Sequence, residues 1–236
     1  MKFIIICLLS LATFSPVLSQ EVSTITVNTM EFGTSAFKAW MKYPAFESGT
    51  VFFKDNSIAE ARLNLNRLTG EIFFLSAKGD TLILKDPQST SQVTIGRDTF
   101  CFYKDRFFIK LSHYEGSTNL FLGETLKYLG KEKKGAYGSY SSVAASNSSS
   151  SYTDDRQITT FLAPDENLLF NKRSDYLLSN SADIFYEVSR PALIELNKTF
   201  ETEINALLKE HNLNLRKGAD LLKLLEHLHA LRMRGN

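Results

Sequence analysis

The chain has 236 residues, a formal net charge of +1 and 18 phenylalanines. This length allows one large domain or two small ones, and large aromatic residues bury enough apolar area to supply a core. A nearly neutral chain has no case for the basic stripe or patch that nucleic-acid binding requires. Nucleic acid is therefore excluded as an expected partner.

Residues 1–19 have the features of an export signal. Lys2 supplies a positive charge, a short apolar run follows, and Val17 and Ser19 fit the rule for cleavage before Gln20. The apolar run is short for a membrane span, which needs about 20 residues. We therefore predict a signal peptide over residues 1–19 and an exported mature protein without a transmembrane anchor.

Residues 20–130 alternate short apolar runs with turn-forming residues. About eight strand-like runs occupy residues 50–129, and pairs such as Asp-Asn at 55–56 and Thr-Gly at 69–70 separate them. Residues 24–27 add a candidate edge strand. Strands at this regular spacing predict an antiparallel β-meander, folded as a sandwich or a partly open barrel.

The composition changes after residue 130. Residues 131–156 contain a lysine-rich step and then a serine-rich tract. Such a tract cannot bury enough apolar surface to offset the entropy of ordering, so it is predicted to be a flexible linker. Residues 157–178 hold two more apolar runs around a turn, which are expected to return to the main sheet as strands.

Residues 179–236 are predicted to be helical, which makes the fold class α+β. Ser181 is a suitable N-cap for a helix over residues 182–188, and Pro191 suits the first turn of the next helix. Apolar residues then recur every three or four positions along 193–208 and again along 221–231. Neither stripe can be hidden by its own helix, so we expect an αα-hairpin that docks on the sheet.

Few residues show a pattern typical of catalysis or metal binding. Cys101 is the only cysteine outside the predicted signal peptide, and it lies in an apolar run where a free cysteine is usually a core residue. His227 and His229 would point about 200° apart on a helix, which does not suit a shared metal ion. No cofactor and no metal are predicted, and enzyme activity is left open but not favoured.

Strict alternation at residues 61–66 allows two interpretations. The apolar residues at 61, 63 and 65 share one face of a strand, whereas Arg62, Asn64 and Asn66 share the other. That polar face is a candidate binding site for a glycan or a peptide. It is also what the solvated face of an antiparallel sheet looks like, and this second interpretation is favoured.

Three stretches of the sequence resemble a group of uncharacterised exported proteins of Bacteroidota. They are "YPAFESGTVFFKDNSIAEARLNLNRLTGEIFFLSAKGDTLIL", "KKGAYGSYSS" and "ETEINALLKEHNLNLRKGADLLKLLEHL". The group has an LNYN-like strand, an AYG-serine tract and a lysine-rich two-helix end. This chain departs from it at Leu65, where Tyr is usual, and at Asn56, where a turn Gly is usual. The resemblance implies the periplasm or cell surface of a Gram-negative bacterium, and it implies no activity.

Thr81 lies in an Asp-Thr-Leu sequence similar to the O-glycosylation motif of some Bacteroidota. The simpler interpretation is a hairpin Asp followed by a strand Thr, because Gly-Asp is a common hairpin turn. Thr81 is therefore a candidate modification site that the sequence does not favour.

The expected function is that of a non-catalytic exported cell-envelope module, with an envelope protein or a glycan as its partner. One alternative is a carrier that closes a small barrel around an apolar ligand, with a cavity lined by Phe73, Phe100, Phe102 and Phe107. A second alternative is a hydrolase with a convergent acid/base pair. A solid core favours the binding module, and a lined cavity favours the carrier.

Overall fold

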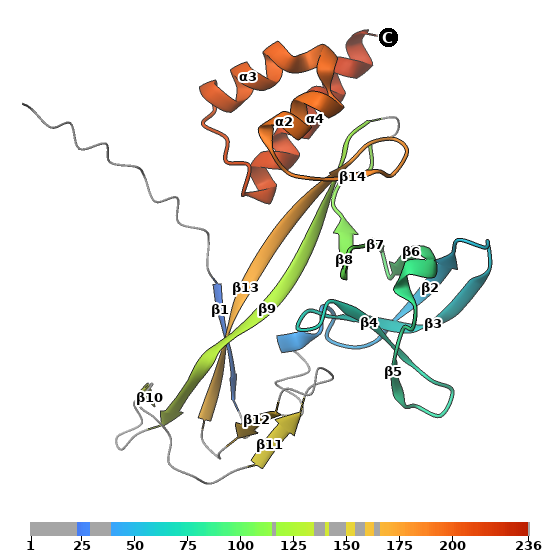
Figure 1. Cartoon of the computed structure of the whole chain (residues 1–236), viewed down its shortest axis with the longest axis vertical. Helices are drawn as coiled ribbons and strands as arrows, with labels where there is room; N and C mark the ends of the chain where they lie inside the picture. Colours follow the sequence, from blue (N-terminus) through green and yellow to red (C-terminus); the bar gives the residue numbers. More distant parts are fainter. Residues whose placement is uncertain are drawn as a thin grey trace, which may run out of the picture.

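The computed structural model describes residues 23–28, 39–114, 117–134, 140–141, 150–153, 159–162 and 166–235. It consists of one large antiparallel sheet, a small two-stranded sheet and a C-terminal group of helices (Figure 1). The predicted signal peptide lies outside the described residues, as does most of the predicted linker.

Eight strands occupy the region predicted to be a meander. They are β2 (Glu47–Phe53), β3 (Ile58–Asn66), β4 (Glu71–Leu75), β5 (Thr81–Ile83), β6 (Thr90–Ile95), β7 (Asp98–Tyr103), β8 (Arg106–Lys110) and β9 (Asn119–Lys134). The tight turns between them use residues with positive φ, among them Asn56 (67°), Gly79 (88°) and Lys104 (58°). Asn and Gly tolerate this conformation best, which is why the sequence marked most of these turns.

The strand order corrects the prediction of one continuous meander. Along the sheet the order is β9-β8-β7-β6-β2-β3-β4-β5. The chain leaves β5, passes the 3₁₀ helix η2 (Pro87–Ser89), and returns to pair β6 with β2. Two four-stranded meanders therefore lie side by side in one open sheet, which does not close into a barrel.

Two long strands connect this sheet to the rest of the molecule. β9 and β13 (Glu166–Ser179) pair antiparallel from Asn119–Ser179 to Lys133–Glu166, with a bulge between Leu169 and Phe170. They form the long twisted ribbon in Figure 1. The edge strand predicted near the N-terminus is present as β1 (Ser23–Asn28), paired with β13.

The predicted boundary at residue 130 is wrong, because β9 continues through it to Lys134. Within the predicted linker, β10 (Tyr140–Ser141) pairs with β9. β11 (Ser150–Thr153) pairs with β12 (Thr159–Leu162) in the small separate sheet. Of the two strands expected over residues 157–178, only β13 therefore joins the main sheet.

The C-terminal region has a strand in place of one expected helix, and a second expected helix is divided in two. β14 (Phe185–Glu187) pairs with the end of β13, where the sequence predicted a helix capped by Ser181. That prediction is wrong because Asn180 Oδ1 accepts hydrogen bonds from the backbone N–H groups of Ala182 and Ile184, at 3.0 Å each. These bonds form a tight turn that sends the chain back along β13.

Three helices replace the expected pair. They are α2 (Arg190–Leu196), α3 (Glu201–Glu210) and α4 (Gly218–Gly235), with the 3₁₀ helix η4 (Lys198–Phe200) after α2. Pro191 stands in the first turn of α2 as predicted, and Ser189 caps that helix. Asn197 ends α2 because its Nδ2 donates to the carbonyl of Leu193, and this interrupts the single helix expected over 193–208.

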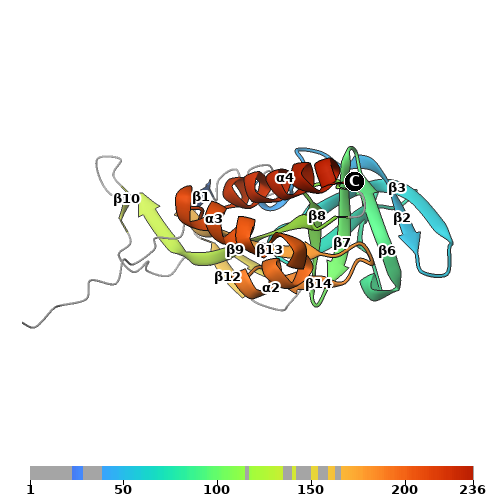
Figure 2. The same ribbon diagram turned by 90° about the horizontal axis from the view of Figure 1, so that it is seen from above.

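The helices dock on the ends of β9 and β13 (Figure 2). Leu120 and Leu178 from the strands are fully buried against Leu193, Ile204 and Leu221 from the three helices. Among the described residues, no helix combines the length and the apolar character that crossing a membrane requires. The shared burial of leucines from the strands and the helices confirms the predicted docking of a helical unit on the sheet.

Candidate functional site

The polar side of β3 is not the solvated face that the sequence favoured. Asn64 is 0% exposed and Asn66 is 6% exposed, whereas Arg62 is exposed. The reason is that residues 39–46, which we call the strap, run across this side of the sheet. Met41 and Phe46 of the strap are buried together with Phe73 of β4.

The side chains predicted to form a polar row bind the strap. Asn64 Nδ2 donates to the carbonyls of Tyr43 (3.0 Å) and Ala45 (3.1 Å), and Asn64 Oδ1 accepts from the Tyr43 N–H (3.1 Å) and the Leu65 N–H (2.9 Å). Arg62 donates twice to the carbonyl of Phe46, from Nε at 3.1 Å and from Nη2 at 2.7 Å. These hydrogen bonds hold a segment of the same chain, and not the separate glycan or peptide that the sequence analysis considered.

Asn66 has a local role in the same region. Its Oδ1 accepts from the Leu68 N–H at 2.9 Å, which shapes the turn between β3 and β4. The amides of Asn64 and Asn66 are thus used inside the fold, and neither side chain is presented to solvent. Thr81 is exposed at the start of the edge strand β5, directly after the Lys78-Gly79-Asp80 turn, so its modification stays a prediction.

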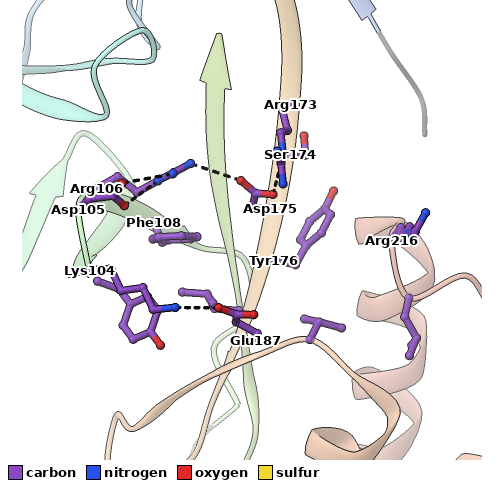
Figure 3. Close-up of a pocket in the computed structure, with 14 residues that line it drawn as sticks. Lys104, Asp105, Arg106, Phe108, Arg173, Ser174, Asp175, Tyr176, Glu187 and Arg216 are labelled. Carbon is purple, nitrogen blue, oxygen red and sulfur yellow. Dashed lines mark hydrogen bonds and ion pairs between the residues drawn. The ribbon is translucent and has the colours of Figure 1, made fainter. Parts of the chain in front are cut away.

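A different site lies where the main sheet, the long ribbon and the helices meet. We call it the charged groove, and it has a volume of about 880 Å³. Its walls come from the β7–β8 turn, from β13 and β14, and from the loop between α3 and α4 (Figure 3). The lining side chains are Tyr103, Lys104, Asp105, Arg106, Phe108, Arg173, Ser174, Asp175, Tyr176, Leu177, Glu187, Val188, Leu215 and Arg216.

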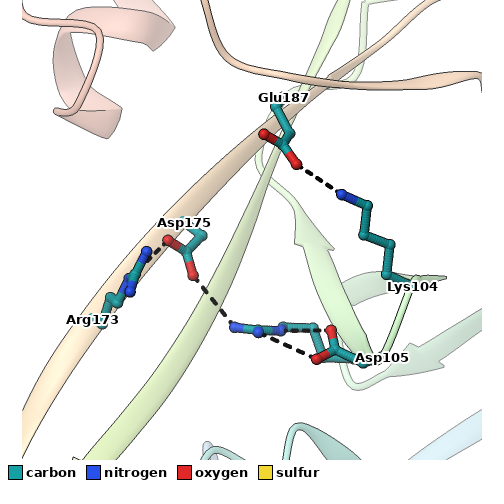
Figure 4. A network of polar contacts seen from close by, with 6 residues as sticks. Lys104, Asp105, Arg173, Asp175 and Glu187 are labelled. Carbon is teal, nitrogen blue, oxygen red and sulfur yellow. Dashed lines mark hydrogen bonds and ion pairs between the residues drawn. The ribbon is translucent and has the colours of Figure 1, made fainter.

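Two sets of ion pairs join opposite walls of the groove (Figure 4). Lys104 Nζ at the β7–β8 turn lies 2.7 Å from Glu187 Oε1 on β14. Arg106 Nη1 on β8 lies 3.3 Å from Asp175 Oδ2 on β13, and Arg173 Nε lies 3.1 Å from the other oxygen of Asp175. Lys104–Glu187 and Arg106–Asp175 connect residues that are distant in sequence, so the tertiary fold creates these two pairs, whereas Arg173 and Asp175 are two residues apart on β13.

The Lys104–Glu187 pair is accessible to solvent. The hydrogen bond and the charge of Lys104 lower the pKa of Glu187, and Glu187 in turn raises the pKa of Lys104. Their side chains are 73% and 61% exposed, and exposed pairs contribute little to stability. A partner can therefore exchange one of these contacts for its own at small cost.

Aromatic rings complete the groove. Phe108 is buried at its base, and Tyr103 stands at its side in edge-to-face contact with Phe108, with ring centroids 6.2 Å apart. Tyr176 lines the wall toward the helices. Aromatic residues and Arg are enriched at protein interaction sites, where aromatic rings supply contact area at low cost in conformational entropy.

Sequence analysis missed the charged groove because its parts are not close in the sequence. Lys104 and Asp105 form the tight β7–β8 turn, in which Lys104 adopts a left-handed conformation. The Arg-Ser-Asp sequence at 173–175 lies in β13, but only the apolar run before it was expected to form a strand. A turn of two charged residues without Gly or Asn was the one local signal available.

The other candidate residues do not converge. Cys101 is half-buried, and burial followed by the nearby charge of Asp183 raises the pKa of its thiol to about 11. The ring of His229 stacks on Tyr114 at 4.6 Å between centroids, whereas His227 is exposed. Within the described part of the chain, no group of three or more His, Cys, Asp or Glu side chains is arranged to hold a metal ion.

The protein therefore combines an open antiparallel sheet, a docked helical unit and a groove of mixed charge between them. Comparison with known proteins adds no family to this description. No family model matches the chain, and neither the curated proteins nor the solved structures contain a significant match.

Proposed function

We propose that the protein is a non-catalytic, exported binding module of the cell envelope, and that the charged groove is where it binds a protein partner. The observation that carries the proposal is the arrangement of Lys104–Glu187 and Arg106–Asp175 across a groove of about 880 Å³. Export rests on the sequence of the first 19 residues and on the resemblance to exported proteins.

A patterned set of both charges suits a protein segment better than a simple ion. Complementary charges align a partner and exclude partners with the wrong pattern, and they speed association more than they add affinity. The exposed guanidinium of Arg216 and the free end of Arg173 add positive charge at the rim. The expected partner surface therefore carries acidic groups at its edges and a basic group opposite Asp175 or Glu187.

Of the four phenylalanines that the carrier alternative named, only Phe102 lines a hollow. Phe100 (0% exposed) and Phe107 (3% exposed) pack into a continuous cluster with Leu63, Ile72 and Val93, rather than lining a cavity. Phe73 belongs to a separate cluster under the strap. The sheet is open, and the side chains of its core pack against one another. This solid core favours the binding module.

The hydrolase alternative would require a carboxyl group with a raised pKa to act as a general acid near neutral pH. In the charged groove the pKa of Glu187 is shifted in the opposite direction, by its hydrogen bond to Lys104. Asp175 accepts from two guanidinium groups. These carboxylates are arranged to hold cations, which suits recognition better than proton transfer.

The proposal is tested by affinity capture from native envelope fractions with a charge-reversed groove. The double variant Arg173→Glu/Arg216→Glu should lose a partner that the parent protein captures, and the loss should be mimicked by raising the salt concentration. The control is Lys85→Glu/Arg97→Glu, which makes the same charge change at exposed residues outside the groove. Equal capture by the parent and the groove variant, with both folded, would contradict the proposal.

A further inference from the structure

The side of the sheet opposite the main core carries a row of threonines. In the strand register, Thr50 of β2 lies opposite Thr94 of β6, and Thr94 lies opposite Thr99 of β7. All three are half-buried. Neighbouring strands are about 4.8 Å apart, so the row presents hydroxyl groups at a regular interval across the sheet.

Thr99, at one end of this row, lines a second hollow of about 680 Å³, which we call the lysine hollow. It lies beside β6 and β7, and the turn between β13 and β14 forms one of its sides. The lining side chains are Lys54, Pro87, Gln88, Thr90, Ser91, Gln92, Thr99, Cys101, Phe102, Lys104, Lys110, Phe121, Asp183 and Phe185.

The lysine hollow is positively charged although the chain as a whole is nearly neutral. Lys54, Lys104 and Lys110 line it, and Asp183 is the single acid among the lining residues. Lys104 is paired with Glu187. Lys54 and Lys110 make no ion pair with any residue that the structure describes, so their charges are available to an anionic ligand.

The remaining lining groups are suited to a ligand rich in hydroxyls. The amides of Gln88 and Gln92 and the hydroxyl of Thr99 each donate and accept hydrogen bonds. Phe185 stands at the side of the hollow with its ring 5.0 Å from that of Phe121 and 5.4 Å from that of Tyr103. This fixed, half-buried ring offers an apolar surface beside the polar groups.

We propose that the lysine hollow and the adjacent threonine row bind an acidic saccharide. Carboxylates or other anionic groups of the sugar pair with Lys54 and Lys110, because charge-assisted hydrogen bonds are the stronger ones. The sugar hydroxyls bond to Gln92, Thr99 and the threonine row, and a ring face packs on Phe185. The volume falls within the range of about 300–1,000 Å³ that small-ligand sites occupy.

This inference is independent of the proposed function. Lys104 lines both sites, but Lys54 and Lys110 line only the lysine hollow, and Arg173 lines only the charged groove. Variants at these positions therefore separate the two sites. Loss of saccharide binding with intact partner capture, or the reverse, identifies which proposal has failed.

The test is calorimetric titration of the mature protein with trigalacturonate, with neutral galactotriose and with inorganic phosphate. We expect saturable binding of trigalacturonate, at least about tenfold weaker in Lys54→Gln/Lys110→Gln. Asp183→Asn should bind more tightly, because it removes the one acid at the site. The control Lys78→Gln/Lys85→Gln removes the same charge from exposed residues elsewhere and should bind as the parent does.

Each comparison has an outcome that overturns the proposal. If trigalacturonate does not bind, or if the double lysine variant binds it as tightly as the parent, the lysine hollow is not the site. If galactotriose binds as tightly as trigalacturonate, the lysines do not select an anion. If inorganic phosphate displaces trigalacturonate at equal concentration, the site binds an anion and does not recognise a saccharide.

Discussion

Asn64 gives the most direct test of how the strap is held. The change Asn64→Ala removes four hydrogen bonds to main-chain groups, two of them to Tyr43, one to Ala45 and one to Leu65. Leu65 is 3% exposed, so water cannot replace the partner of its N–H, and an unsatisfied buried group costs about 1–3 kcal/mol. Ala45 is exposed, and water can reach its carbonyl.

Adding these contributions, we expect Asn64→Ala to lower the free energy of unfolding by about 2–4 kcal/mol. The measurement is urea denaturation of the variant beside the parent protein. The matched control is Glu60→Ala, on the same strand and the same side of the sheet but exposed, which should change stability by no more than about 0.5 kcal/mol. Equal, small effects of both changes would refute the role of Asn64 in holding the strap.

Four further predictions concern other parts of the molecule. Burial raises the pKa of Glu124, but the hydrogen bond and charges of nearby cations lower it further, to below its ordinary value of 4.5. The stability that Glu124 contributes is therefore present above that value and is lost as the pH falls through the lowered pKa. The free energy of unfolding of Glu124→Gln, measured by urea denaturation, should therefore fall less between pH 7 and pH 3 than that of the parent protein. With a pKa of about 11, the Cys101 thiol should react with iodoacetamide at pH 7.5 at least about tenfold more slowly in the folded than in the unfolded protein, and equal rates would contradict its burial. A Cβ on Gly123 would lie 2.6 Å from the Phe108 ring, so Gly123→Ala should cost about 1–3 kcal/mol in the same denaturation assay. Intact-mass measurement of protein from native envelopes should show a mature N-terminus at Gln20, and a full-length membrane-held chain would contradict export.

Features set by neighbouring residues could be predicted from the sequence. The eight strands from β2 to β9 were expected because turn residues such as Asn56 and Gly79 separate apolar runs. The docking of leucine-rich helices was expected because their apolar stripes need a partner surface. Both predictions depend on spacings of a few residues, over which local preferences act directly.

Features set by distant contacts could not be predicted in this way. Asn64 alternates with leucines as a solvated residue would, and only the strap, about twenty residues earlier, makes it a buried residue. The return from β5 to pair β6 with β2 leaves no local signal in the sequence. The residues at 182–188 have a suitable helix cap, but pairing of β14 with β13 overrides it.

The charged groove shows the same limit for function. The ion pairs that cross the groove join residues separated by 69 and 83 positions, so no motif of fixed spacing could reveal them. Single-sequence reasoning identified Arg62, Asn64 and Asn66 instead, because an alternating strand is a local pattern. Their hydrogen-bonding capacity was read correctly, whereas their partner, the strap, depended on the tertiary fold.

The most direct test of the central claim places a photo-crosslinking amino acid at Ser174, inside the charged groove, in the protein expressed in its native host. We predict a discrete crosslinked adduct with an envelope protein after irradiation, and its loss when Arg216→Glu, a change in the groove alone, is added. The same amino acid at the exposed position Lys85 should give no such adduct. A folded protein that forms no adduct at Ser174, or the same adduct from both positions, would contradict the assignment of the groove as the binding site.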